Sequence, residues 1–128
     1  MCLDRTASFK PNKYGYKWVV TDGKNYYSAN CDESFQYKKS EWDNAKIVKI
    51  WGAMGFPENR GFHIFNHLNE AKESDWQCIV PRVAGRKVIL VKVQFKDYIT
   101  GYGDGLGGYK FKMIVAQKMK IIGKINVE

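Results

Sequence analysis

The segment 109–122 constrains the fold most, because it alternates between two kinds of side chain almost throughout. One face carries apolar residues: Phe111, Met113, Val115, Met119 and Ile121. The opposite face carries four lysines, with Ile114 and Ala116 between them: Lys110, Lys112, Lys118 and Lys120. A period of two is typical of a strand that is buried on one side. The segment therefore predicts an amphipathic strand of an antiparallel sheet, and the two apolar residues among the lysines indicate that part of that face is covered.

An earlier pair of segments predicts a β-hairpin. Residues 14–20 alternate and place aromatic side chains on one face, which indicates a strand. Asp22 and Gly23 supply a two-residue turn, and residues 24–29 would form the partner strand. Residues 30–44 are polar and mixed, so we expect a loop there with one anchoring aromatic residue.

Three further segments also predict strands. Residues 46–51 and residues 77–81 are short and rich in β-branched or aromatic side chains. Residues 86–95 alternate well, and we expect a central strand with one apolar face: Ile89, Val91, Val93 and Phe95. The glycine-rich segment 101–108 is interpreted either as a loop whose backbone amides approach a phosphate or as a mobile connection between two strands. It lacks the Walker spacing, which favours the second interpretation.

The segment 61–71 runs from a short aromatic strand into a polar-capped helix, and it holds both histidines, His63 and His67. We expect Asn66 to cap a helix over residues 67–74. The two histidines would share a face only if the whole segment were helical, which its aromatic start disfavours. We therefore interpret His63 as a packed, hydrogen-bonding residue and not as a metal ligand.

The length of 128 residues fits one compact α+β domain, residues 1–128. We expect mainly antiparallel sheet with one short helix and a long C-terminal strand, preceded by an irregular arm over residues 1–13. No apolar run is long enough for a membrane span or a signal segment, so we expect a cytoplasmic protein. The three cysteines, Cys2, Cys31 and Cys78, are interpreted as reduced thiols.

The net charge of +8 at pH 7 favours an anionic partner, although it would also serve solubility alone. Candidate anion-binding residues are the basic side chains of the predicted strands and turns: Lys17, Lys24, Arg86, Lys87, Lys92, Lys110, Lys112, Lys118 and Lys120. Candidate ligand contacts are Arg60, His63, Tyr102 and Tyr109. The lysine face of the last strand would meet a row of phosphates or would guard an edge strand against aggregation, and both interpretations remain open.

Aromatic and basic residues interleave in the first third of the chain. The aromatic members are Tyr14, Tyr16, Trp18, Tyr26, Tyr27 and Tyr37, and the basic members are Lys13, Lys17, Lys24, Lys38 and Lys39. This mixture stacks bases while it neutralises phosphates. Because a strand turns one face inward, we expect Tyr16 and Trp18 to be buried and Lys17 and Lys24 to remain free.

A Gly-Phe-His-x-Phe strand at residues 61–65, a Leu-x-x-Ala helix at residues 68–71 and a late Gly-Tyr-Lys at residues 108–110 give the chain a family resemblance. It resembles a loosely defined group of small, uncharacterised phage and bacterial proteins. The same strand-helix-strand passage is similar to the middle of ADP-ribosyltransferase-type folds. That second resemblance implies an enzyme that uses NAD, or a non-catalytic binder of a nucleotide-like ligand.

The residues themselves predict no catalytic site, no metal site and no cofactor. The Gly-x-Ser-x-Gly, HExxH and CxxC patterns are lacking, and Lys112 and Lys118 stand on the last strand where a transferase would carry glutamate. We therefore expect a non-enzymatic phage or mobile-element accessory protein, for example one that counters host defence. Its basic face would bind a nucleotide signal, nucleic acid or an acidic host protein. The alternatives are an ADP-ribosyltransferase-like enzyme and a homo-oligomer-forming structural protein.

Overall fold

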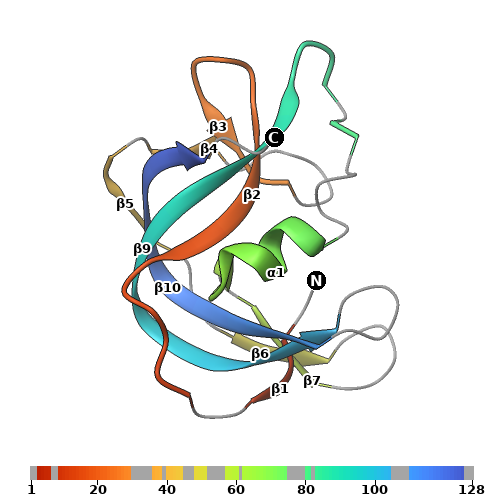
Figure 1. Ribbon diagram of the computed structural model, residues 1–128, viewed down its shortest axis with the longest axis vertical. Coiled ribbons are helices and arrows are strands. Elements are labelled where there is room, and N and C mark those ends of the chain that lie inside the picture. Colours follow the sequence, from red (N-terminus) through yellow and green to blue (C-terminus); the bar gives the residue numbers. More distant parts are fainter. Residues whose placement is uncertain are drawn as a thin grey trace.

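Two long strands, β9 (Lys87–Asp104) and β10 (Lys110–Ile125), dominate the computed structural model (Figure 1). The structure describes residues 3–6, 9–29, 36–38, 40–44, 48–51, 57–60, 62–74, 80–81, 83–104 and 110–125. The other elements of these residues are β1 (Leu3–Thr6), β2 (Gly15–Thr21), β3 (Tyr26–Tyr27), β4 (Gln36–Tyr37), β5 (Trp42–Asn44), β6 (Val48–Trp51), β7 (Pro57–Arg60), β8 (Phe62–Phe65) and α1 (Leu68–Glu73). The predicted mainly antiparallel sheet with one short helix is confirmed.

The strand pairings close on themselves. β9 pairs with β10, β10 with β8, β8 with β2, and β2 again with β9, all antiparallel. The junction between β2 and β8 is the single pair Tyr16↔Phe65. Next to it, a Cβ on Gly15 would collide with Ile64 Cγ2 and would lie 3.1 Å from the carbonyl oxygen of Phe65. Glycine therefore permits the close approach that closes the ring.

Short strands extend this ring. β3 and β4 continue the sheet outward from β2, and β1, β7 and β6 continue it from β9. β5 pairs with β10 beyond the end of β8, through Asn44↔Lys118, Asp43↔Met119 and Trp42↔Lys120. The outer surface thus includes a place where β5, β10 and β9 lie side by side.

The inward-facing positions of β10 change part-way along the strand. Four of its residues lie in one interior cluster although their spacing is uneven: Ile114, Ala116, Met119 and Ile121. Opposite the point of change, Asp97 of β9 has a φ of 52°, in the left-handed region. The register is the same before and after it, because Ala116 pairs with Tyr98 and Lys118 pairs with Lys96. The inward-facing positions of both strands therefore change at the same place, and the pairing register is unchanged there.

This change divides the predicted lysine face. Lys112 shares the parity of Ile114 and lies near the ring of Phe9, whereas Lys118 and Lys120 share the opposite face with Lys96. The prediction of one continuous lysine ladder is therefore wrong. Periodicity assumed a regular strand, and the left-handed backbone of the partner strand breaks that assumption.

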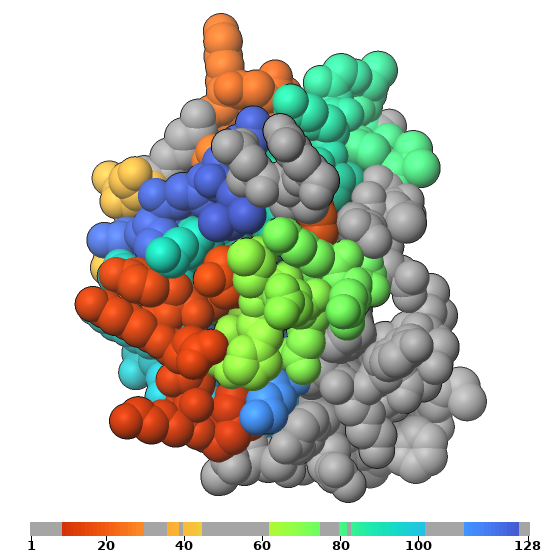
Figure 2. Space-filling view, viewed as in Figure 1, coloured from red at the N-terminus to blue at the C-terminus, as the bar shows by residue number. Residues whose placement is uncertain are grey.

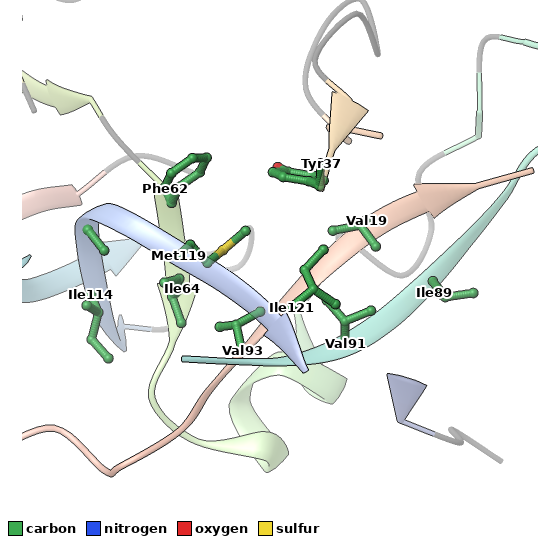
Figure 3. Close-up of a cluster of buried hydrophobic side chains, with 11 residues drawn as sticks. Val19, Tyr37, Phe62, Ile64, Ile89, Val91, Val93, Ile114, Met119 and Ile121 are labelled. Carbon is green, nitrogen blue, oxygen red and sulfur yellow. The ribbon is translucent and has the colours of Figure 1, made fainter. Parts of the chain in front are cut away.

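The interior cluster fills the ring of strands. Figure 3 shows Val19 of β2, Val91 and Val93 of β9 and Ile121 of β10 gathered in its centre. Tyr37 of β4 covers one side of the cluster, and its ring lies 6.1 Å from that of Phe62. The predicted apolar face of residues 86–95 is confirmed, because Ile89, Val91 and Val93 are buried here and the half-buried Phe95 packs against them.

A second apolar cluster lies on the other face of the strands, beneath α1. Trp18, Phe65, Leu90, Met113 and Val115 are buried there together with Ala71 of the helix. The Trp18 indole Nε1–H donates to the carbonyl oxygen of Ala71 over 2.8 Å, in a buried position. A six-residue helix is marginal by itself, so this docking stabilises it.

The helix begins differently from the prediction. It spans Leu68–Glu73 with His67 as N-cap, and no side chain caps it. Asn66, the predicted cap, is buried, and its Oδ1 accepts a hydrogen bond of 2.8 Å from the backbone N–H of Asn12. In Figure 2 the segment that starts at residue 9 (red) lies beside the segment 62–74 (green), in agreement with this contact. The amide of Asn66 thus joins two distant segments.

Other predicted boundaries change as well. Residues 30–44 were predicted as a loop, but they include β4 and β5, and residues 3–6 of the predicted irregular arm form β1. Gly101 to Asp104, predicted as part of a glycine loop, belong to β9. The remaining residues of that loop and residues 77–79 of the predicted short strand lie outside the described residues.

The predicted hairpin of residues 14–29 is confirmed, with a four-residue connection in place of a two-residue turn. The Asp22 carboxylate accepts the backbone N–H groups of Lys24 and Asn25, and Gly23 has a φ of 99°. These hydrogen bonds favour the charged carboxylate and lower the pKa of Asp22 to about 2.

Candidate anion-binding surface

A shallow groove of about 410 Å³ lies on the outer surface where β5, β10 and β9 run side by side. Its lining combines three lysines, two aromatic rings and one amide: Lys13, Lys96, Lys120, Trp42, Phe95 and Gln94. We call it the Trp42 groove. Positive charge and aromatic ring surface therefore meet in one open concavity.

Strand register explains why these side chains share a face. Trp42 is paired with Lys120, and Lys120 is paired with Gln94, so the three form a row across the strands. Met119, next to Lys120, is fully buried, so this row points outward. The neighbouring row also carries charge: Asn44, Lys118 and Lys96.

Trp42 is the centre of the groove. The Nζ atom of Lys96 lies 4.2 Å from its ring centroid, and that of Lys120 lies 5.4 Å away. Both distances fall within the range of cation–π attraction, about 6 Å. Two ammonium groups therefore lie next to the same indole ring.

A second aromatic ring with two lysines, that of Tyr14, lies just before β2. The Nζ atom of Lys92 is 4.3 Å from the ring centroid of Tyr14, and that of Lys13 is 5.4 Å away. Lys13 also lines the Trp42 groove. Lys92, Gln94 and Lys96 occupy alternate outward positions of β9, so this strand connects the two aromatic rings.

The positive charges around the groove are offset by few negative charges. Lys118 pairs with Asp97 over 3.8 Å, and both side chains are about half exposed. Within the described part of the chain, no ion pair involves Lys13, Lys92, Lys96 or Lys120. Glu41, next to Trp42, is exposed. The surface therefore keeps a local excess of positive charge.

Of the predicted anion-binding residues, Lys92 and Lys120 belong to this surface and Lys118 borders it. Lys17 does not, because its ammonium turns inward and donates to the carbonyl oxygen of His63 over 2.8 Å. Burial lowers the pKa of Lys17 to about 8. The prediction that Lys17 remains free at the surface is therefore wrong.

Three other predicted residues lie together at the far end of β2. Lys87 is paired with Thr21, Lys24 lies in the turn that follows, and the guanidinium carbon of Arg86 lies 3.7 Å from the ring centroid of Tyr27. Lys24 and Lys87 are exposed, as expected for free basic side chains. They are separate from the Trp42 groove.

The remaining predicted residues are not part of the Trp42 groove as the structure describes it. The backbone N–H of Lys112 donates to Glu70 Oε2 over 3.3 Å, and His63 lies on β8, half-buried. The backbones of Arg60, Tyr102 and Lys110 belong to β7, β9 and β10, but their side chains lie outside the described residues, as does Tyr109.

Sequence reasoning missed Lys96 and Gln94 as members of the site. It included Lys13 and Tyr14 only in a general aromatic and basic mixture, and it treated the Trp42 region as a loop. One signal was present, since Lys92, Gln94 and Lys96 are polar at alternate positions opposite an apolar face. The pairing of β5 with β10 has no such local signal.

Among the described residues, no three His, Cys, Asp or Glu side chains gather in a way that could hold a metal ion. No helix in the same residues is long and apolar enough to cross a membrane. Comparison with protein-family models, curated proteins and solved structures gives no match.

Proposed function

We propose that this protein is a non-enzymatic binding protein that holds an anionic partner in the Trp42 groove. The observation that carries the proposal is the indole of Trp42 with the ammonium groups of Lys96 and Lys120 within 5.4 Å of its centroid. An anion that binds in the groove is attracted by both ammonium groups. The net charge of +8 would attract such a partner from a distance.

The biological setting is a further part of the proposal. The resemblance of the segment 61–71 to small phage and bacterial proteins supports a phage or mobile-element accessory protein that acts in the host cytoplasm, for example against host defence. The basic groove supports this role, because nucleotide signals, nucleic acids and acidic host proteins are all anionic.

The proposal is tested with fluorescently labelled heparin, a soluble polyanion, by anisotropy at low and moderate salt. The double variant Lys96→Glu/Lys120→Glu should bind heparin at least about tenfold more weakly than the unaltered protein, because it replaces attraction by repulsion in the groove. The matched control is Lys24→Glu/Lys87→Glu, which changes the net charge equally at two exposed positions outside the groove. Its affinity should stay within about threefold.

Equal loss of affinity in both double variants would contradict the proposal, because net charge alone would then explain binding. Undetectable heparin binding by the unaltered protein at low salt would contradict it as well.

The two alternatives are separated by other measurements. Transfer of label from NAD to host proteins would support an ADP-ribosyltransferase-like enzyme and contradict a non-enzymatic role. A discrete oligomer in light scattering that does not respond to salt, with no heparin binding, would support a structural protein.

A further inference from the structure

We infer that the ligand of the Trp42 groove is a single-stranded nucleic acid. Its bases stack on Trp42 and Tyr14, and its phosphates contact the lysines that surround these rings: Lys13, Lys92, Lys96 and Lys120. The inference rests on the proposed function, and it adds the ligand class and the role of each ring.

The two rings have the same construction. Each carries two ammonium groups within 5.4 Å of its centroid, namely Lys96 and Lys120 at Trp42 and Lys13 and Lys92 at Tyr14. Proteins that bind single strands combine aromatic rings, on which bases stack, with a basic groove that follows the backbone. An acidic protein would use the lysines but would have no use for the ring faces.

The arrangement of the rings favours a strand over a single nucleotide. Lys92 and Lys96 lie four residues apart on β9, about 13 Å along a strand of ordinary rise. Gln94 lies between them on the same face, where its amide both donates and accepts hydrogen bonds to base edges. A mononucleotide would occupy one ring and leave the other unused, and a duplex would keep its bases stacked away from both.

The first test uses a labelled single-stranded oligonucleotide of about 12 nucleotides, within the range that small single-strand-binding domains cover. Trp42→Leu and Tyr14→Leu should each weaken binding about 5- to 150-fold, because each removes one stacking surface. Each should weaken oligonucleotide binding by a larger factor than heparin binding, because heparin has no bases to stack and loses only the ring's contact with the lysines. Trp42→Phe should restore most of the affinity that Trp42→Leu loses.

The matched control is Tyr27→Leu. Tyr27 is also an aromatic ring under a cation, with Arg86 at 3.7 Å, but it lies outside the groove. Its replacement should leave oligonucleotide affinity within about threefold. Circular dichroism and thermal melting of every variant identify any that fail to fold. If Trp42→Leu does not fold, Trp42→Phe still tests the role of the Trp42 ring.

The second test measures tryptophan fluorescence. The oligonucleotide should quench part of the emission of the unaltered protein, whereas heparin should quench little. Trp42→Phe should still bind the oligonucleotide but should lose that quenching. Equal quenching in Trp42→Phe would overturn the role of Trp42.

The two proposals fail in different ways. If Lys96→Glu/Lys120→Glu binds heparin as well as the unaltered protein, the groove is not an anion site and the proposed function is wrong. If that double variant loses heparin binding but Trp42→Leu and Tyr14→Leu bind the oligonucleotide normally, only the nucleic-acid inference is overturned. Equal competition by AMP or by polyglutamate, or tighter binding of a duplex of the same sequence, would also overturn it.

Discussion

Lys17 and Lys120 illustrate how neighbouring structure decides what a lysine can do. Lys120 stands in an outward row between Trp42 and Gln94, where its charge is available to a ligand. Lys17 shares its side of β2 with the buried Val19, and its ammonium donates to the His63 carbonyl oxygen. Basic residue type alone therefore assigns too many lysines to a binding surface. Strand register is needed to show which of them point outward.

The burial of Lys17 predicts a pH dependence of stability. Its pKa is about 8 in the folded protein and near 10.5 in the unfolded chain. Between these values the unfolded chain binds more protons, so stability rises with pH. The free energy of unfolding should rise by about 2 kcal/mol between pH 7 and pH 9.5 relative to Lys17→Met, which lacks this group. Urea unfolding of both proteins at the two pH values checks this, and parallel behaviour would contradict it.

Gly15 predicts a second effect of a single residue. Gly15→Ala places a methyl group against Ile64 and the Phe65 carbonyl oxygen at the closure of the ring. Overpacking of this kind should lower the free energy of unfolding by about 1–3 kcal/mol, measured by urea titration. Gly123→Ala is the control, because no atom lies within 4 Å of its added Cβ, and its effect should be below about 0.5 kcal/mol. Equal effects of the two substitutions would refute close packing at Gly15.

Among the elements, the hairpin of β9 and β10 depends on one unusual backbone conformation. Asp97 has a φ of 52°, which a β-branched residue adopts at a cost of about 1–2 kcal/mol. Asp97→Val should therefore lower the melting temperature, whereas Asp97→Gly should leave it unchanged or raise it, because glycine adopts this conformation freely. Both variants remove the exposed pair with Lys118, so the difference between them isolates the backbone term. A larger drop in melting temperature for Asp97→Gly than for Asp97→Val would contradict a left-handed backbone conformation at this position.

The elements also differ in how well the sequence predicts them. The alternation of residues 86–95 and 109–122 predicts β9 and β10, since burial of one face requires that pattern. The prediction of one continuous lysine ladder is wrong because the left-handed Asp97 lies on the partner strand, and the sequence pattern of β10 does not indicate it. The prediction that Asn66 caps the helix is wrong because its side-chain oxygen accepts a hydrogen bond from the distant backbone N–H of Asn12.

For the whole molecule, closure of the ring and assembly of the groove are long-range events. β2 pairs with both β8 and β9, and the groove combines Lys13, Trp42, Lys96 and Lys120 from four separate parts of the chain. Local periodicity cannot predict which strands become neighbours. The net charge did predict an anionic partner, and that prediction is now a proposal with a defined location.

The most direct measurement of the central claim is a heteronuclear NMR titration of the four tryptophan indole N–H signals with heparin. The Trp42 signal, assigned by its loss in Trp42→Phe, should shift progressively with heparin and return toward its free position as salt is added. The Trp18 signal should remain in place, because its N–H is buried and bonded to Ala71. A Trp42 signal that stays in place while heparin binds would contradict an anion-binding Trp42 groove.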